Sequence, residues 1–335
     1  MVDYETLIDS LPENWQPSAS LGILKLRADK LRSTRAFFFD NGCLEVETPC
    51  LSNSIAAEQH IEPFKFTFQN EQYYLQTSPE LAMKRLLASG SGAIYQLANV
   101  FRTAETGCLH NPEFKLLEWY QPDWTYVQLM QQVDEFVRLI IGTEIILQQT
   151  EYFSYQYVFQ KYVNVDPFAD SQARLVKAVH EAGVNLTGIA LESRDQWLDL
   201  LFSHVIQPRL PKDTPVFIHE FPVSQAALAE IKESDNDKTP NVALRFELII
   251  NGIELANGFQ ELRNAKEQLR RFELVNENRI EQQQSPLDID LKFIAALKQG
   301  LPKCAGVAVG FDRLMMLALN KENIQDVMAF AWQTK

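Results

Sequence analysis

The feature that most constrains the fold is a pair of apolar runs joined by a polar stretch, within residues 94–120. The first run, residues 94–101, is followed by a polar segment that ends at His110, and the second run starts at Phe114. Two runs connected in this way predict an antiparallel hairpin whose loop can fold over a ligand. A cation, an imidazole and a carboxylate on one rigid hairpin indicate a ligand with both phosphate and amine groups. The hairpin residues in question are Arg102, His110, Glu118 and Tyr120.

Two interpretations of this hairpin are open. One makes Arg102 and Glu118 an ordinary cross-strand ion pair. The other rests on the complete string FR…HNPEF..LEWY at residues 101–120, which resembles motif 2 of the lysyl branch of the class II aminoacyl-tRNA synthetases. That resemblance implies an α+β fold, in which helices flank a central antiparallel sheet, and activation of an amino acid with ATP.

A segment near the N-terminus resembles a second motif of the same family. Residues 20–40 carry apolar side chains at helical spacing, and Asn41-Gly42 is a typical C-terminal stop. A short predicted strand, residues 44–48, follows and ends at Pro49. Helix, strand and proline resemble motif 1, which forms the homodimer interface in this family, so the resemblance implies a homodimer.

The third motif lies close to the C-terminus. Residues 305–317 read as a glycine-spaced strand that turns into an apolar helix, and they resemble motif 3, whose final arginine matches Arg313. A glycine-rich turn before a helix is a weak signal by itself. The resemblance is carried by three motifs in the family's order.

The chain length favours one large catalytic domain, residues 19–335, after a lead-in of residues 1–18. Residues 125–210 are mostly helical by pattern and are expected to pack around the central sheet as an insertion. Met130 and Phe136 within this stretch are expected core residues.

Several shorter elements complete the expected fold. Residues 64–76 predict a hairpin with its turn at 69–72. Ser78 is the expected N-cap of a helix over residues 81–88, with a proline just inside it. Further strands are expected at residues 215–219, 245–250 and 252–262, and a helix at residues 265–284.

Composition excludes several classes of protein. A formal charge of −13 and a sequence pI near 4.9 disfavour a protein that wraps nucleic acid, so we expect no tRNA partner. No apolar stretch reaches the roughly 18 residues of a membrane span, and the acidic N-terminus does not fit a signal peptide. We therefore expect a cytoplasmic protein without membrane contact. Disulfides and structural zinc are not expected, because no CxxC spacing occurs among Cys43, Cys50, Cys108 and Cys304.

Activation joins a carboxylate to the α-phosphate of ATP and expels pyrophosphate. The carboxylate is already ionised at neutral pH, so catalysis rests on positioning and on neutralising phosphate charge. By the resemblance, Arg102 and Arg313 are catalytic: Arg102 bridges substrate carboxylate and α-phosphate, and Arg313 holds ATP with its adenine against Phe114. Glu247 and Glu254 are expected to hold Mg²⁺, which prefers oxygen ligands. The implied ATP-binding residues are Arg102, Thr103, Ala104, His110, Asn111, Phe114, Glu247, Leu248, Gly310 and Arg313.

The amine end of the substrate requires negative charge. Clustered carboxylates resist joint ionisation unless a cation joins them, and a diamino acid supplies that cation. Side chains of a regular strand alternate between its two faces, so residues at even and odd positions point to opposite sides. Alternation alone would therefore not place Glu254 on the same face as Asn257 and Glu261. Their assignment rests on the resemblance. The implied substrate-binding residues are Ser78, Pro79, Glu80, Glu118, Tyr120, Glu254, Asn257, Glu261 and Ala308.

Ala308 is a candidate specificity residue. It stands where lysyl-tRNA synthetases of this branch typically carry glycine. We expect its methyl group to intrude on the amine end of the pocket and so to discriminate between β-lysine and α-lysine. The alternative is that Ala308 only packs under the motif 3 strand.

Three functions stay open within the family. The string Ser224-Gln225-Ala226 resembles the paralogues that attach (R)-β-lysine to a lysine of elongation factor P, and this is the first interpretation. The second is a lysyl-tRNA synthetase core acting on α-lysine, against which stand the acidic charge and the absence of a preceding anticodon-binding domain. The third is a non-catalytic paralogue, because Ala104 and Cys108 stand where the family carries glutamate and arginine.

Overall fold

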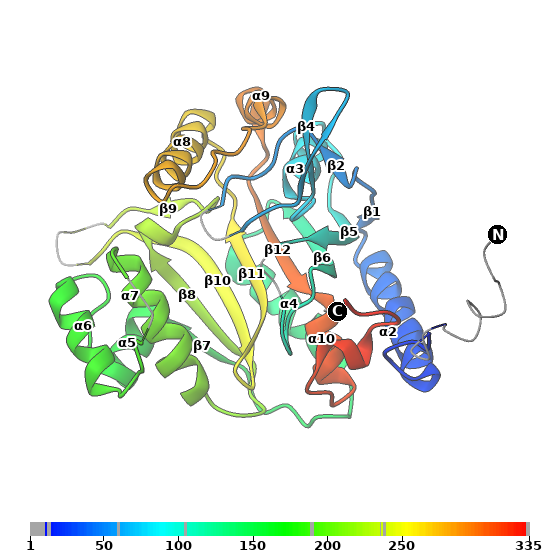
Figure 1. Cartoon of the computed structure of the whole chain (residues 1–335), viewed down its shortest axis with the longest axis horizontal. Helices are drawn as coiled ribbons and strands as arrows, with labels where there is room; N and C mark the ends of the chain where they lie inside the picture. The colour runs from blue at the N-terminus through cyan, green and yellow to red at the C-terminus, as the bar shows by residue number, and fades with distance from the viewer. Residues whose placement is uncertain are drawn as a thin grey trace.

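The structure, a computed structural model, describes residue 11 and residues 15–58, 61–103, 106–187, 191–234, 236 and 239–332. Within these residues the centre is a nine-stranded sheet in the order β1-β5-β6-β12-β11-β10-β8-β7, with β9 paired to β10 (Figure 1). Its strands are β1 (Leu44–Glu45), β5 (Ile94–Phe101), β6 (Glu113–Pro122), β7 (Glu151–Ser154), β8 (Val216–Pro222), β9 (Ile231–Lys232), β10 (Val242–Ile250), β11 (Ile253–Gln260) and β12 (Cys304–Gly310).

The pairing of these strands confirms the predicted central antiparallel sheet. Every neighbouring pair from β5 through to β8 is antiparallel. The two ends of the sheet differ, because β1 joins β5 and β7 joins β8 in parallel. The sequence pattern did not predict these parallel edges.

A smaller sheet consists of β2 (Leu51–Ser52), β3 (Lys65–Phe68) and β4 (Glu71–Leu75). Its β3–β4 hairpin confirms the prediction for residues 64–76. The two turn residues, Gln69 and Asn70, both have positive φ, as a two-residue hairpin turn of the right twist requires.

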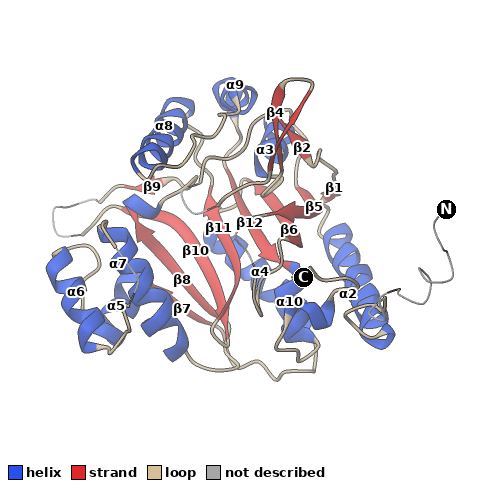
Figure 2. Ribbon diagram, in the orientation of Figure 1, coloured by secondary structure: helices blue, strands red, loops and turns tan. Residues whose placement is uncertain are grey.

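Apart from α4, the helices group around the sheet in three places. In Figure 2, α5 to α7 gather beside β7 and β8, whereas α3, α8 and α9 lie together near one end of the strands. Helices α2 and α10 lie near the C-terminus. The helices are α2 (Leu21–Asp40), α3 (Glu80–Ala88), α4 (Tyr126–Ile141), α5 (Tyr155–Val163), α6 (Gln172–Glu181), α7 (Arg194–Leu201), α8 (Ala265–Glu281), α9 (Leu291–Gly300) and α10 (Phe311–Ala318).

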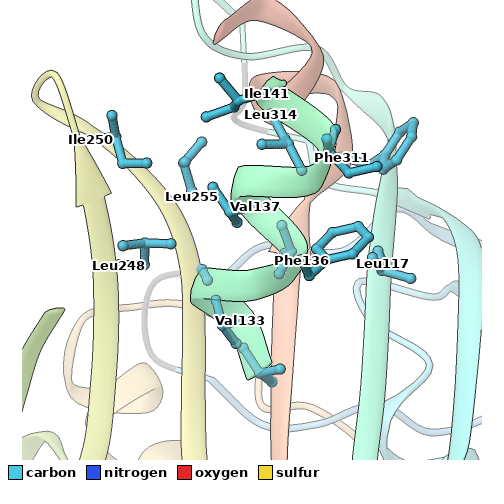
Figure 3. Close-up of a cluster of buried hydrophobic side chains, with 14 of the residues drawn as sticks. Leu117, Val133, Phe136, Val137, Ile141, Leu248, Ile250, Leu255, Phe311 and Leu314 are labelled. Atoms are coloured by element: carbon cyan, nitrogen blue, oxygen red, sulfur yellow. The ribbon is translucent and has the colours of Figure 1, made fainter. Parts of the chain in front are cut away.

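Helix α4 covers one face of the sheet and forms the centre of the main apolar core. A capping box between Thr125 and Gln128 starts this helix, and most of its apolar side chains are buried. Figure 3 shows them against side chains of β6, β10, β11 and α10. Met130 and Phe136 are buried here as predicted. The labelled side chains of this cluster are Leu117, Val133, Phe136, Val137, Ile141, Leu248, Ile250, Leu255, Phe311 and Leu314.

The predicted motif 1 helix is confirmed with small changes at its edges. Ser20 caps α2 by accepting a hydrogen bond from the Ile23 amide. The helix ends at Asp40, and its C-cap Asn41 is followed by Gly42 with φ of 70°. The strand after it is shorter than predicted, because only Leu44–Glu45 pairs with β5.

The predicted N-cap of α3 is wrong by one residue. The helix begins at Glu80, so Pro79 occupies the N-cap position, and its ring cannot form a side-chain hydrogen bond to the helix. Ser78 still accepts a hydrogen bond from the Glu80 amide at 3.0 Å. Its hydroxyl therefore supports the start of the helix from one residue further out.

The stretch 125–210 is mostly helical, as predicted, but it also contributes a strand. β7 pairs with β8 at the edge of the main sheet. The predicted lead-in, residues 1–18, falls largely outside the described residues. None of the described helices is long and apolar enough to span a bilayer.

Candidate active site

A pocket of about 350 Å³ lies on the face of the sheet opposite to α4. Phe246 and Leu248 face the apolar cluster around α4, so the intervening Glu247 points to the other face, where the pocket lies. The pocket gathers fifteen of the residues that the sequence proposed: Ser78, Glu80, Arg102, His110, Asn111, Phe114, Glu118, Tyr120, Glu247, Glu254, Asn257, Glu261, Ala308, Gly310 and Arg313.

Four proposed residues are not among those that line it. Leu248 is fully buried in the apolar cluster, because the strand alternation that aims Glu247 at the pocket turns its neighbour away. Thr103 is turned to another loop, where its amide and hydroxyl both donate to the Glu62 carbonyl. Pro79 is the buried N-cap of α3. Ala104 lies outside the described residues.

A β-bulge explains how Glu254 and Asn257, at an even and an odd position of the same strand, both reach the pocket. The register between β10 and β11 pairs Leu248 with Ala256 but Ile249 with Glu254, so Leu255 is the extra residue. A bulge shifts the alternation by one residue. Glu254 therefore lies on the same side as Asn257, although strict alternation would separate them.

One end of the pocket, called the amine end because the sequence predicts the substrate amine there, centres on Glu118, which is 2% exposed. Its two carboxylate oxygens accept hydrogen bonds from the hydroxyls of Ser78 at 2.8 Å and Tyr120 at 2.6 Å. Burial, and next the negative charge of Glu80, raise the pKa of Glu118 to about 8. With a pKa of about 8, Glu118 is largely protonated at neutral pH, and a bound ammonium group would displace the proton.

Sequence reasoning missed a lysine at this end. Lys84 has no exposed surface, and its Nζ lies 2.6 Å from Glu80 and 2.5 Å from Glu261. The available signal was its position four residues after Glu80 on the same helix. A helical lysine is ordinarily a solvated residue, so this signal was too weak to act on.

A glycine makes room for two of the pocket side chains. A Cβ at Gly306 would lie 2.3 Å from the Tyr120 ring and 2.5 Å from a carboxylate oxygen of Glu261. These contacts are too close for any side chain, so the glycine is required by the close approach of β6 and Glu261 to β12.

The other end of the pocket carries arginines suited to phosphate. The guanidinium of Arg102 lies 5.1 Å from the centroid of the Phe114 ring. Arg313 donates to the carbonyls of Leu109 at 3.2 Å and Glu254 at 3.1 Å. Both cations are thereby held in place before a ligand arrives, which is what charge stabilisation in a transition state requires.

The chain fits Mg²⁺ when ATP phosphates share the ion. The pKa of Glu247 rises to about 8, first by burial and next by the charge of Glu254, so the two carboxylates are close enough to repel each other. A divalent cation between them would relieve that repulsion. The described residues contain no group of three or more such ligands, so the phosphates would have to complete the coordination.

Arg245 lines the pocket and is another cation that the sequence did not reveal. It forms an ion pair with Glu247, donates to the Asn257 side chain at 3.2 Å and lies over the Phe221 ring at 4.5 Å. It also donates to the Gln225 carbonyl at 2.9 Å. This arginine therefore joins the expected metal end, the amine end and the loop after β8.

The three motifs are also linked to one another. Asp312 of motif 3 accepts from the Lys115 amide of motif 2 at 2.6 Å and forms an ion pair with Arg27 of α2 at 2.6 Å. The motif 2 loop is further held by the C-terminal segment, since the Ile324 amide donates to the Cys108 carbonyl and the Trp332 amide to the Asn111 side chain. The segments of the resemblance thus form one connected site.

Comparisons with known proteins agree with this architecture. The family described as tRNA synthetases class II (D, K and N) matches residues 15–334. An elongation factor P–(R)-β-lysine ligase of Haemophilus ducreyi is 46% identical over 323 residues, which cover 95% of this chain and 96% of that protein. Ligases of the same name from Yersinia pestis and Yersinia pseudotuberculosis are 45% identical, over 95% of this chain and 97% of theirs. The chain therefore belongs to the class II aminoacyl-tRNA synthetase family, which confirms the resemblance of its three motifs.

Proposed function

We propose that this chain is an ATP-dependent ligase that activates (R)-β-lysine as its adenylate and transfers it to a lysine side chain of elongation factor P. The observation that carries the proposal is one pocket with opposite charge at its two ends. Arg102 and Arg313 suit a triphosphate, whereas Glu80, Glu118 and Glu261 suit amines. The names of the relatives reported above support the choice of substrate and acceptor.

In the first step a carboxylate oxygen of β-lysine attacks the α-phosphorus of ATP, and pyrophosphate leaves. Arg102 is placed to orient the carboxylate and α-phosphate, and Arg313 to hold the nucleotide. Glu247 and Glu254 would hold Mg²⁺, which supplies further positive charge to the phosphates when bound. Glu118, with its two hydroxyl partners, fixes an amine so that the carboxylate reaches the phosphate.

In the second step the amine of the acceptor lysine attacks the acyl carbon, and AMP leaves. That amine must first lose its proton, because the pKa of a free lysine is about 10.4. The mixed anhydride with AMP supplies the good leaving group. The net reaction forms one amide bond and releases AMP and pyrophosphate.

Two assays test the proposal and separate it from its alternatives. We expect ATP–pyrophosphate exchange that depends on β-lysine more strongly than on α-lysine, and transfer of labelled β-lysine to elongation factor P. The net charge of −13 leads us to expect no comparable charging of tRNA. Lysine esterified to tRNA at the rate of transfer to elongation factor P would favour a synthetase, and absence of exchange with either isomer would favour a non-catalytic paralogue.

Ala308 supports the choice of isomer. On β12 it stands in register between Glu118 of β6 and Asn257 of β11, at the pocket floor. We expect Ala308→Gly to raise exchange with α-lysine relative to β-lysine, since one methyl group is worth about 10- to 200-fold in discrimination. Ala305→Gly, on the same strand but buried under α4, is the matched control and should leave the ratio unchanged. The same isomer ratio in Ala308→Gly and the wild type would refute the assignment.

We also propose a homodimer through motif 1. Leu21 and Phe39 of α2 and Leu44 of β1 expose 69%, 81% and 56% of their surface, which suits burial against a second copy. We further propose that residues 19–335 form one catalytic domain, because β7 of the 125–210 stretch belongs to the same sheet as the motifs.

A further inference from the structure

The buried lysine at the amine end carries an inference that rests on the proposed function and deepens it. Lys84 contacts one oxygen of Glu80 and one of Glu261, and its Nζ lies 5.9 Å from the centroid of the Phe293 ring. The cation reaches these groups from α3, whereas Glu261 follows β11 and Phe293 belongs to α9. Three separate parts of the fold therefore converge on one ammonium group.

A buried ammonium group is costly unless carboxylates pair with it. Here Lys84 donates a hydrogen bond to Glu80 and forms an ion pair with Glu261. Burial by itself would lower the pKa of Lys84, but the two carboxylates raise it, so the group is charged. Burial raises the pKa of Glu261 to about 7, and the positive charge of Lys84 keeps that rise from being larger. The lysine and its two glutamates are thus one interdependent unit.

The charge of the amine end follows from this unit. Glu80, Glu118 and Glu261 are three carboxylates, and Lys84 is one ammonium group, so their formal sum when ionised is −2. Glu58 also lines the pocket and interacts with Glu80 and Lys84, but the positive charges of Arg102 and Arg245 act on it more strongly than Lys84 does, so it is counted with those arginines. β-Lysine carries two ammonium groups, which would bring the sum to zero.

We propose that Lys84 is a specificity-determining residue: by neutralising one of three carboxylates, it sets the amine end to accept a substrate with two ammonium groups. Each carboxylate that it contacts keeps a second oxygen for the substrate. The second oxygen of Glu261 lies beside Gly306, which also lines the pocket, so no side chain at position 306 covers this oxygen. A substrate with one ammonium group leaves a buried negative charge unbalanced, which is strongly unfavourable.

A double-mutant cycle separates this role in charge balance from simple packing. Glu261→Gln leaves a sum of −1 and should raise the KM for β-lysine by about tenfold or more. Adding Lys84→Met restores −2, and it should recover at least about threefold of that loss. The KM for ATP should stay the same in both variants. A double variant no better than Glu261→Gln would overturn the proposal.

Substrates with one amine give a second measurement, the preference for β-lysine over a monoamine acid. A role of Lys84 in packing alone would not change this preference. The probes are hexanoic acids that carry only the amine nearer the carboxylate or only the terminal amine. Glu261→Gln should narrow the preference of the wild type for β-lysine over these acids, and the double variant should restore it. If the proposal holds, the preference for β-lysine over the monoamine acids changes with the formal charge of the amine end. The same preference in the wild type, Glu261→Gln and the double variant would contradict the proposal.

Controls keep the outcome clear. Lys177→Met on α6 is matched, because Lys177 also pairs with a glutamate four residues away but is 70% exposed, and it should leave all KM values unchanged. Thermal unfolding shows which variants fold, and the deciding comparison does not need Lys84→Met alone. A wild type that activates no diamino acid overturns both the proposed function and this inference. Activity with β-lysine, but no recovery in the double variant, overturns this inference alone.

Discussion

Arg102→Ala is expected to lower ATP–pyrophosphate exchange by at least about 10²- to 10³-fold, since removing one preorganised charge donor from a transition state has an effect of that size. The guanidinium is held over the Phe114 ring and donates to the Thr77 carbonyl at 3.5 Å, so it is positioned before ATP binds. Loss of the side chain removes the cation that we assign to the substrate carboxylate and the α-phosphate. The measurement is exchange at saturating β-lysine and ATP.

The matched control is Arg270→Ala. Arg270 lies on the exposed surface of α8 in an ion pair with Glu267, away from the pocket, and its removal should leave exchange unchanged. Thermal unfolding of Arg102→Ala should show a folded protein. Near-normal exchange in a folded Arg102→Ala protein would rule out the role assigned to this arginine.

Much of the fold follows from local signals in the sequence. The motif 2 hairpin, helix α2 and the β3–β4 hairpin are predicted from apolar pattern, the Asn41-Gly42 stop and turn residues, and all three are confirmed. The β3–β4 turn is shorter than predicted, since Glu71 and Gln72 already belong to β4. The parallel edges are different, because short strands such as β1 form only where the rest of the sheet offers a free edge. Tertiary context decides such strands.

In the site, too, some residues can be predicted from local sequence signals and others depend on tertiary context. A motif locates side chains that lie on regular strands, which is why most of the proposed residues reach the pocket. The bulge at Leu255 cannot be read from alternation, because it breaks the alternation. Lys84 and Arg245 have no motif signal, since charged residues on a helix or strand ordinarily face water. Only the folded arrangement of α3, β10 and β11 shows that these two cations are internal partners of pocket glutamates.

Glu118→Gln is expected to raise the KM for β-lysine by about 30-fold or more at pH 8.5, because it removes the charged partner of a buried ammonium group. An amide of the same shape keeps a hydrogen-bonding group beside Ser78 and Tyr120, so the fold should be preserved. The KM for ATP should change little, since Glu118 belongs to the amine end. Glu113→Gln, an exposed residue on the same strand, is the matched control and should behave as the wild type.

The pH dependence makes this prediction sharper. The pKa of Glu118 is raised to about 8, so below this pH the free pocket holds a proton that β-lysine must displace. Binding should therefore tighten as the pH rises from 6 to 8.5, by at most about tenfold per unit below the pKa, while the substrate amines, with pKa near 10, stay charged. The glutamine of Glu118→Gln cannot ionise. The ratio of the variant's KM for β-lysine to that of the wild type should therefore be smaller at pH 6, where Glu118 of the wild type is itself protonated. The pH dependence that remains in the variant should follow Glu261 and Glu58, whose pKa values burial raises to about 7. A penalty of equal size at pH 6 and pH 8.5 would show that Glu118 does not bind the substrate as an ionised carboxylate.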